Sequence, residues 1–369
     1  MLDTKEAHIN VKPYKFAAGT LAVGQEMRVL ANWLEQTNDW SLHEESFFSQ
    51  WELSLDACDL PSNLSWVNSR DFIERLKLLV SDWFDTPLAS DYHLVAHRLC
   101  DGQRICTHTD APRPGYETHR LAICLSDFKS DSAGGHWCVL SSKNESSISN
   151  VIRPMFGSFF SFEATNKSFH AVVPVNGYSR LSIVANLWHP ANHPTTIELL
   201  NSLIEQATKA NEYLIYTIGS KLINCYDENR FDKIEHGIAT LKNHLLQTAY
   251  LLALWTKDRD LIIAGLAHSV QGTPHYKLGD ESLPDDVLSQ LISAEAKKYI
   301  SEYNECLKNP GDTPSDSSIL ISLANNIANA TSAIFSRGAW EQERVYFCRH
   351  IDRLPLTARE ICASYYMLT

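Results

Sequence analysis

The sequence contains no uninterrupted apolar run of the roughly 20 residues that a membrane-spanning helix requires. Its first residues, MLDTKEAHINVKPYKF, also lack the apolar segment of a secretory signal, so we expect neither a membrane anchor nor export. Basic residues are scarce: 32 Lys and Arg stand against 44 Asp and Glu, for a net charge of −12. A general nucleic-acid-binding surface needs the opposite balance, and we therefore expect no nucleic-acid partner.

Paired cysteines are also missing. The nine cysteines are scattered, and no two of them form a C-x-x-C pair, which argues against a zinc ribbon or a redox dithiol. Their number is odd and their density is low, as expected for reduced thiols in a cytoplasmic protein.

What the sequence does contain is enough apolar material for two domains. It is 369 residues long and 44% hydrophobic, and the pattern of its apolar residues changes near residues 190–195. Short segments rich in Phe, Trp and Val precede this point, and long segments with helical periodicity follow it. We predict domains at 1–194 and 195–369. In the first we expect helices at 25–36 and 70–84, a strand at 47–55, and mainly strands between 92 and 188.

The segment His108-Thr109-Asp110 carries the chemistry of the first domain. Residues two apart on a strand point to the same face, so we expect the imidazole of His108 beside the carboxylate of Asp110. With a second imidazole from His170, they make the ligand set of a non-haem Fe(II) site that leaves coordination positions open. Arg180 follows, and its guanidinium can hold a carboxylate with two hydrogen bonds, while Ser182 on the same strand face can add a hydroxyl donor.

These residues belong to an ordered pattern. The segments are YHLVAHRLCDGQRICTHTD, HRLAICLSDF, AGGHWCVL and VIRPMFGSFFSFEATNKSFHAVVPVNGYSRLSIVANLW. Together they resemble the prolyl-hydroxylase-like Fe(II)/2-oxoglutarate-dependent oxygenases, in which H-x-D, a Gly-Gly turn, H-x-V-x-P-V and R-x-S follow one another. The resemblance implies an α+β protein whose first domain is a double-stranded β-helix, or jelly roll, preceded by helices.

The resemblance also implies cofactors and a reaction. His108, Asp110 and His170 would bind Fe(II), and Arg180 and Ser182 would hold the distal carboxylate of 2-oxoglutarate. The reaction would consume O₂, convert 2-oxoglutarate to succinate and oxidise a substrate. In the halogenating members an Ala or Gly replaces the carboxylate ligand. Because Asp110 is present here, we expect hydroxylation or a related oxidation such as desaturation or cyclisation.

Strand alternation selects candidate substrate residues. Asn186 and Trp188 share a face with Arg180 and Ser182, so they are expected to look into the barrel. Trp188 could equally pack at the barrel mouth. Arg104 shares its parity with His108 and is either an anchor for an anionic substrate or a surface arginine. The substrate itself, whether small molecule, amino acid or peptide, is not specified by the fold.

The second domain is expected to be all-helical. Leu199, Leu200, Leu203 and Ile204 begin one amphipathic helix, and a second carries an apolar stripe of Leu241, Leu245, Thr248, Leu251, Leu252 and Trp255. The segment HGIATLKNHLLQTAYLLALWTKDRDLIIAGLAHSVQGT is similar to HD-type helical domains. Those domains carry one His on a helix and a His-Asp doublet on a later helix.

His244 and His268 match the two histidine positions, but Ser269 stands where the HD family has Asp. The later helix offers Asn325, Asn326 and Asn329 and no carboxylate. Because neutral side chains are weaker ligands than a carboxylate, a dinuclear site is not expected. The four histidines of this region could still bind one metal, or they could be hydrogen-bonded core residues: His236, His244, His268 and His275.

Three functions remain open. The first is an oxygenase acting on a small molecule, an amino acid or a peptide, with the helical domain as an accessory or a homo-oligomer contact. The second is a non-catalytic sensor of O₂ or 2-oxoglutarate, or an interaction protein. The third is a bifunctional enzyme with a second metal site in the HD-like domain. The complete ligand set and the R-x-S pair favour the oxygenase.

Overall fold

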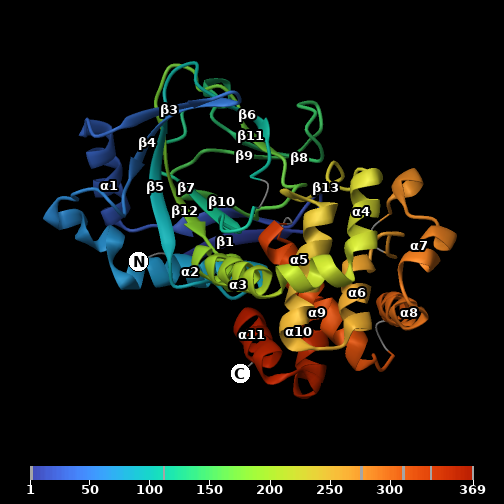
Figure 1. The fold of residues 1–369 in the computed structure, drawn as a ribbon. Coiled ribbons are helices and arrows are strands. Elements are labelled where there is room, and N and C mark those ends of the chain that lie inside the picture. Colours follow the sequence, from blue (N-terminus) through green and yellow to red (C-terminus); the bar gives the residue numbers. More distant parts are fainter. Residues whose placement is uncertain (1–2, 111–112, 275–276, 310–311, 333–334, 368–369) are drawn as a thin grey trace. The chain divides into compact units, whose positions relative to one another are not determined.

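A computed structural model describes residues 3–110, 113–274, 277–309, 312–332 and 335–367. The chain divides into two compact units, one made of residues 1–112 and 116–193, the other of residues 113–115 and 194–369. The first is built mainly from strands and the second almost wholly from helices (Figure 1). The expected α+β class, a jelly-roll-like sheet followed by a helical region, is confirmed.

Within the described residues of the first unit, twelve strands form one curled sheet in the order β1-β2-β10-β7-β12-β5-β4-β6-β11-β8-β9, with β3 paired to β4. All neighbouring strands in it run antiparallel. The strands are β1 (Asp3–Asn10), β2 (Phe16–Ala22), β3 (Ser41–Glu45), β4 (Phe48–Ser54), β5 (Tyr92–Leu99), β6 (Ile105–His108), β7 (His119–Cys124), β8 (Trp137–Leu140), β9 (Ile148–Ile152), β10 (Ser158–Glu163), β11 (His170–Val172) and β12 (Arg180–Leu187).

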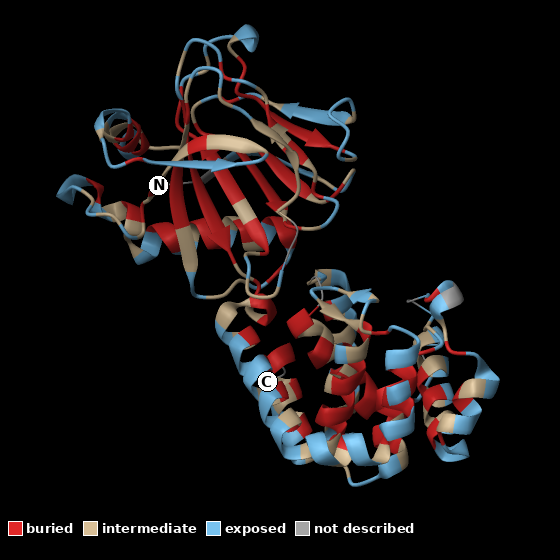
Figure 2. Ribbon diagram, turned by 45° about the horizontal axis from the view of Figure 1, so that its top comes forward, coloured by how far each residue is buried: buried red, intermediate tan, exposed pale blue. Residues whose placement is uncertain are grey.

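The two faces of this sheet pack against different partners. On the outer face, Leu181 and Ile183 of β12 join a core with the helices α1 (Gln25–Gln36) and α2 (Arg70–Phe84). On the inner face, Val184 joins a second core of aromatic and branched residues inside the curl. Figure 2 shows much of the sheet as buried, and every residue of β12 is buried. Successive side chains of β12 therefore pack alternately in the outer core and in the core inside the curl. The even-numbered residues face the inside of the curl.

The expected helices at 25–36 and 70–84 are present with those bounds, because both carry apolar residues at helical spacing. Ser69 caps α2 by accepting a hydrogen bond from the Phe72 backbone N–H. The strands β1, β2 and β3 were not expected. Short 3₁₀ turns complete this unit at Ser62–Asn68, Asp131–Ala133 and Pro190–Asn192.

The second unit begins with α3 (Pro194–Ile218) and α4 (Ser220–Glu228), followed by a small hairpin of β13 (Glu235–His236) and β14 (Ala239–Thr240). Two 3₁₀ turns lie at Gly279–Glu281 and Ile351–Arg353. The remaining helices are α5 (Leu241–Trp255), α6 (Arg259–Ala267), α7 (Asp285–Leu291), α8 (Ala294–Lys308), α9 (Asp316–Ser332), α10 (Arg337–His350) and α11 (Leu356–Tyr366). No helix among the described residues is long and apolar enough to cross a membrane.

Helix α5 is the centre of the second unit. It packs against α3, α6 and α9, and every residue of its expected apolar stripe from Leu241 to Trp255 is buried. The side chain of Thr240 caps its first turn by accepting a hydrogen bond from the Asn243 backbone N–H. The apolar residues that recur at helical spacing in this segment are therefore the residues that are buried in the fold.

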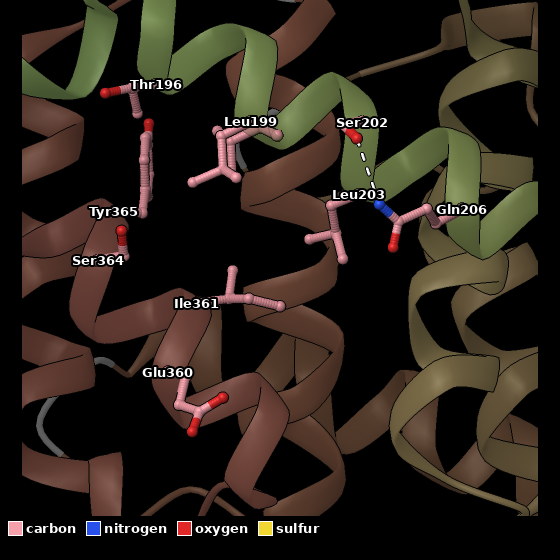
Figure 3. A pocket seen from close by; sticks show the side chains of 10 residues that line it. Thr196, Leu199, Ser202, Leu203, Gln206, Glu360, Ile361, Ser364 and Tyr365 are labelled. Carbon is pink, nitrogen blue, oxygen red and sulfur yellow. Dashed lines mark hydrogen bonds between the residues drawn. The ribbon is translucent and has the colours of Figure 1, made fainter.

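The apolar face of α3 differs in part from the expected one. Leu200 and Ile204 are buried, but Leu199 and Leu203 line a groove of about 280 Å³ that α11 closes on its other side with Ile361 and Tyr365 (Figure 3). The groove floor is mostly apolar. Two of the four leucine and isoleucine positions that begin α3 therefore lie outside the core.

Candidate metal centre

His108, Asp110 and His170 come together in the first unit. His108 ends β6 and pairs directly with His170, the first residue of β11, while Asp110 follows two residues after the strand end. Their ligand atoms all lie within 4.8 Å of one another. The carboxylate oxygens of Asp110 are 3.6 Å from His108 Nε2 and 3.4 Å from His170 Nε2. Two imidazoles and one carboxylate at such distances match the donor set of a non-haem Fe(II) centre.

Both imidazoles are oriented by backbone carbonyls. His108 Nδ1 donates to the Cys106 carbonyl at 2.9 Å, and His170 Nδ1 donates to the Ser168 carbonyl at 2.8 Å. Each bond places the ring proton on Nδ1 and directs the Nε2 lone pair toward the centre, as metal-binding histidines require. Burial, helped by the nearby His108, lowers the pKa of His170 to about 4, so its imidazole is neutral at pH 7.

Asp110 is held by Arg120 of β7, a strand that does not pair with β6 in the sheet order. Arg120 Nη1 lies 2.9 Å from Asp110 Oδ2, and the same guanidinium donates to Glu117. Burial alone would raise the pKa of Asp110, but Arg120 and the two histidines outweigh it and hold that pKa well below its usual range. The carboxylate is therefore ionised and fixed in orientation before any metal binds.

The three residues open onto a cavity of about 370 Å³ inside the curled sheet. Phe160, Phe162 and Val172 line its apolar side, and the Phe47 ring lies 4.6 Å from the ring of His108. The space is of the size that small organic ligands occupy in proteins.

Arg180 lies next to this cavity on the inner face of β12. It is 2% exposed, and its guanidinium carbon stands 4.2 Å from the ring of Trp137, which lines the cavity. Among the described residues its Nε and Nη2 atoms have no hydrogen-bond partner. Since a buried guanidinium without partners is costly, the site fits a ligand that brings an anion to it.

The glycine turn beside Arg180 makes room for its side chain. Gly135 has a φ of 74°, and a Cβ added there would lie 2.9 Å from Arg180 Cδ and 2.5 Å from the Tyr178 hydroxyl. Any larger residue would therefore meet both a disfavoured backbone conformation and the arginine. Ser182, two residues along β12, is buried on the same face.

The lining of the cavity also presents hydrogen-bond acceptors. The side-chain oxygens Gln50 Oε1 and Asn186 Oδ1 are buried with no partner among the described residues. Glu52 also lines the cavity and lies 3.8 Å from His97 Nε2. Burial lowers the pKa of His97 to about 4 against the opposing charge of Glu52. Asn186, expected from strand parity, thus does face the interior.

Two of the expected substrate residues lie elsewhere. Arg104 is exposed, precedes β6, and is not among the described residues that line the cavity. The reason is a bulge: His170 pairs with His108 but Val172 pairs with Ile105, so two residues of β6 between these pairs lie opposite one residue of β11. The bulge turns Ile105 into the cavity in place of Cys106. Trp188 lies one residue beyond β12 with its ring 6.2 Å from that of His193, outside the cavity lining.

Several residues that line the cavity were not predicted from the sequence. Arg120 and Ala122 line the cavity from β7, where Leu121 and Ile123 join the outer core, so alternation along HRLAIC could have found Arg120. Glu52 of β4 had no such signal, because the pairing of β4 with both β5 and β6 is a long-range contact.

The candidate residues of the helical unit also meet. His244 of α5 and His268, which follows α6, bring their Nε2 atoms to 3.4 Å from each other. Both lie about 3 Å from Asn325 Oδ1 of α9, at 3.1 and 3.0 Å respectively. His236 of β13 contacts Asn329 and the ring of His244. His275 lies outside the described residues.

Comparison with protein families separates the two units. Residues 94–188 match the family model of the 2OG-Fe(II) oxygenase superfamily. This 2OG-Fe(II) oxygenase-like segment runs from β5 to just past β12 and contains all three ligand candidates and Arg180. Residues 227–307 match a domain of unknown function, so the HD-like resemblance of the helical unit stays a prediction. Among curated proteins, none gives a significant match to this chain.

Comparison with solved structures finds proteins that are similar to about half of this chain. A Pseudomonas putida prolyl-4-hydroxylase is 15% identical, covers 47% of this chain and 92% of its own, and gives a TM-score of 0.40. A Trichoplax adhaerens prolyl hydroxylase, solved with a hypoxia-inducible-factor peptide, is 14% identical over 49% of this chain and 86% of its own, with a TM-score of 0.39. AviO1 from Streptomyces viridochromogenes is 16% identical over 48% and 91%, with a TM-score of 0.37.

Proposed function

We propose that the 2OG-Fe(II) oxygenase-like unit is an Fe(II)- and 2-oxoglutarate-dependent dioxygenase that hydroxylates, or otherwise oxidises, a small molecule, an amino acid or a peptide. One observation carries the proposal. The convergent donor set of His108, Asp110 and His170 opens onto a cavity beside Arg180, a buried cation whose Nε and Nη2 atoms have no hydrogen-bond partner among the described residues. A metal site and an anion site, next to each other inside one sheet, are what a chelating keto acid requires.

The roles of the residues follow from their contacts. His108, His170 and Asp110 would hold the iron, and Arg180 with Ser182 would bind the distal carboxylate of 2-oxoglutarate. Arg120 keeps Asp110 in place by its 2.9 Å contact. Phe160 and Phe162 make part of the cavity lining apolar. Bound iron and 2-oxoglutarate would supply the oxidising chemistry, in which O₂ is consumed and succinate is released.

We propose further that the substrate carries hydrogen-bond donors, such as an amine or an amide. The cavity lining offers Gln50 Oε1, Asn186 Oδ1 and the carboxylate of Glu52, all acceptors. A group with N–H or O–H donors would satisfy oxygens that otherwise stay unpaired, whereas an anionic substrate would meet Glu52. Arg104, the expected anchor for an anion, lies outside this lining.

Succinate formation tests the reaction. With Fe(II), ascorbate, O₂ and 2-oxoglutarate, the full chain should release succinate slowly by itself and faster with a substrate found by screening amines and amides. His108→Ala or His170→Ala should abolish both rates. His8→Ala, which changes an exposed histidine of β1, is the matched control and should retain them. A chain that binds iron and 2-oxoglutarate but forms no succinate would point to a sensor instead.

The acceptor-rich lining has its own test. For an amine substrate, Glu52→Gln should raise KM, since it removes the carboxylate that faces the donor. The slow succinate formation without substrate should stay near the wild-type rate, because that side reaction involves no substrate contact with Glu52. An unchanged KM would place the substrate elsewhere.

A further inference from the structure

Helix α3 carries a stripe of residues on a face that is not buried in the core of the helical unit. Five residues make up this α3 stripe: Leu199, Leu203, Gln206, Ala210 and Tyr213. Their spacing alternates between four and three residues, which keeps them on one helix face and is typical of residues that contact a second helix. Leu199 is 58% exposed and Tyr213 is 87% exposed. The α3 stripe therefore offers a contact face to another helix.

The two ends of the α3 stripe differ in shape. Its first part borders the groove of about 280 Å³ between α3 and α11, which is lined by Leu199, Leu203, Ile361 and Tyr365 (Figure 3). Its last member, Tyr213, instead projects an exposed ring. Tyr213 lies 14 residues after Leu199, or about 21 Å along the helix. Because one helix holds both the ring and the groove, the ring cannot enter the groove of its own chain.

A two-fold axis beside Gln206 would place the ring of each copy over the groove of the other. In an antiparallel pair of identical helices, residues at equal distances on either side of such an axis meet. Leu199 and Tyr213 each lie seven residues from Gln206, so Tyr213 of one copy meets Leu199 of the second copy, and the same contact repeats by symmetry. Gln206 meets Gln206 of the second copy, and two side-chain amides can donate to and accept from each other.

The charged residues beside the α3 stripe are complementary about the same axis. Glu205 and Lys209 are exposed and form an ion pair within the chain at 2.7 Å. Antiparallel pairing brings this flank of both copies together and places Lys209 of one copy within about 3 Å, measured along the helix axis, of Glu205 of the second copy. The four charges sum to zero. Glu360, on the groove lining, adds a carboxylate that can accept a hydrogen bond from the Tyr213 hydroxyl.

We propose that the α3 stripe and its groove form the interface of a two-fold symmetric homodimer, in which Tyr213 of each copy inserts into the groove of the other. A stable dimer buries at least roughly 1,200 Å², of which two inserted tyrosine rings supply about 300–500 Å². The groove walls and the length of α3, about 37 Å for its 25 residues, supply the remainder. Because the same patch contacts itself, the assembly closes at two copies.

Sedimentation equilibrium of the full chain tests the interface. The wild type should associate to a dimer. Leu199→Arg and Tyr213→Ala should each raise the dimer Kd roughly tenfold or more, as expected for residues at the centre of an interface. Leu78→Arg is the matched control, because Leu78 of α2 is 60% exposed, as Leu199 nearly is, and lies outside the helical unit. It should leave the dimer Kd unchanged.

Charge reversal tests the antiparallel direction. Lys209→Glu places four negative charges together and should raise the dimer Kd, and Glu205→Lys should do so with four positive charges. The double variant Glu205→Lys/Lys209→Glu exchanges the charges in both copies and should restore the wild-type Kd. The circular dichroism of each variant should match that of the wild type, since the substituted side chains are exposed.

Cross-linking tests the position of the axis. In a Cys348→Ser background, which removes an exposed thiol, Gln206→Cys should form a disulfide between two copies when a copper oxidant is added. Thr217→Cys, an exposed position on the same helix but far from the axis, should not. A chain that stays monomeric at every concentration would overturn the proposal and leave the groove to a different partner. A dimer that Leu199→Arg and Tyr213→Ala do not weaken would also overturn it and place the contact elsewhere.

Discussion

The side chain of Arg180 is the residue on which 2-oxoglutarate binding should depend most. Its loss removes charge-assisted hydrogen bonds, each of which contributes roughly 1.5–3 kcal/mol. We therefore expect Arg180→Ala to weaken 2-oxoglutarate binding at least tenfold, measured by calorimetry with Mn²⁺ in place of iron. Arg180→Lys should recover only part of the affinity, because an ammonium lacks the planar fork. Equal affinities for the wild type and Arg180→Ala would assign the anion site to another residue.

Arg120 should act on the metal through Asp110. Its guanidinium fixes one carboxylate oxygen and is itself held by Glu117, so Arg120→Leu leaves the ligand free to rotate. Losses of such outer contacts weaken metal binding by roughly 10- to 100-fold. A metal titration followed by tryptophan fluorescence would measure this change. Arg153→Leu, which breaks an exposed ion pair with Asp131, is the matched control and should bind metal as the wild type does.

At the scale of elements, helix α2 allows a comparison within one helix. Leu76 is 1% exposed in the core beneath the sheet, whereas Leu78 is 60% exposed. Leu76→Ala should reduce the free energy of unfolding by roughly 2–5 kcal/mol, because it removes buried methyl groups and leaves a cavity. Leu78→Ala should change it by less than about 0.5 kcal/mol. Urea unfolding followed by circular dichroism would measure both, and similar losses would contradict the assigned face of α2.

The bulge in β6 shows how one element decides a site. Alternation from His108 selects Cys106 and Arg104 for the interior, but the extra residue reverses the pattern and brings in Ile105. Backbone pairing explains the bulge in part, since the Cys106 N–H donates to the Phe47 carbonyl at 2.7 Å. The same bulge leaves His108 in register with His170, so the metal ligands meet.

At the scale of the whole molecule, ligands of the first unit's site should stabilise the protein. Each unit has its own buried core, and the candidate metal ligands and Arg180 all belong to the first unit. A ligand present at about 100 times its Kd stabilises the folded state by roughly 2.7 kcal/mol. Mn²⁺ with 2-oxoglutarate should therefore raise the Tm of a melting transition in the full chain, and His108→Ala should abolish that rise.

His268→Ala is the informative control for this experiment. It should leave the rise produced by Mn²⁺ and 2-oxoglutarate unchanged, because His268 belongs to the helical unit. If His268→Ala abolished this increase in Tm, the helical unit would have to take part in binding Mn²⁺ and 2-oxoglutarate, contrary to the proposed function.

The sequence alone determined those features that depend on local patterns. Apolar spacing located α1, α2 and α5, and the ordered motifs from His108 to Ser182 located the candidate iron and 2-oxoglutarate residues. Such patterns survive folding because helix and strand periods are properties of the chain itself. The match of residues 94–188 to an oxygenase family agrees with the motif.

Only the tertiary structure decided what depends on pairing between distant segments. The polar strand β1 and the small-residue strand β2 carry weak periodicity. They pair because Gly19, whose added Cβ would lie 2.0 Å from the Glu6 carbonyl oxygen, permits a close approach.

The exclusion of Arg104 from the cavity lining and the contact of Arg120 with Asp110 likewise follow from strand register. Asn325 lies far along the chain from His244 and His268, and only the packing of α5, α6 and α9 places its oxygen between them. Register and helix packing are long-range choices, and a local period does not encode them.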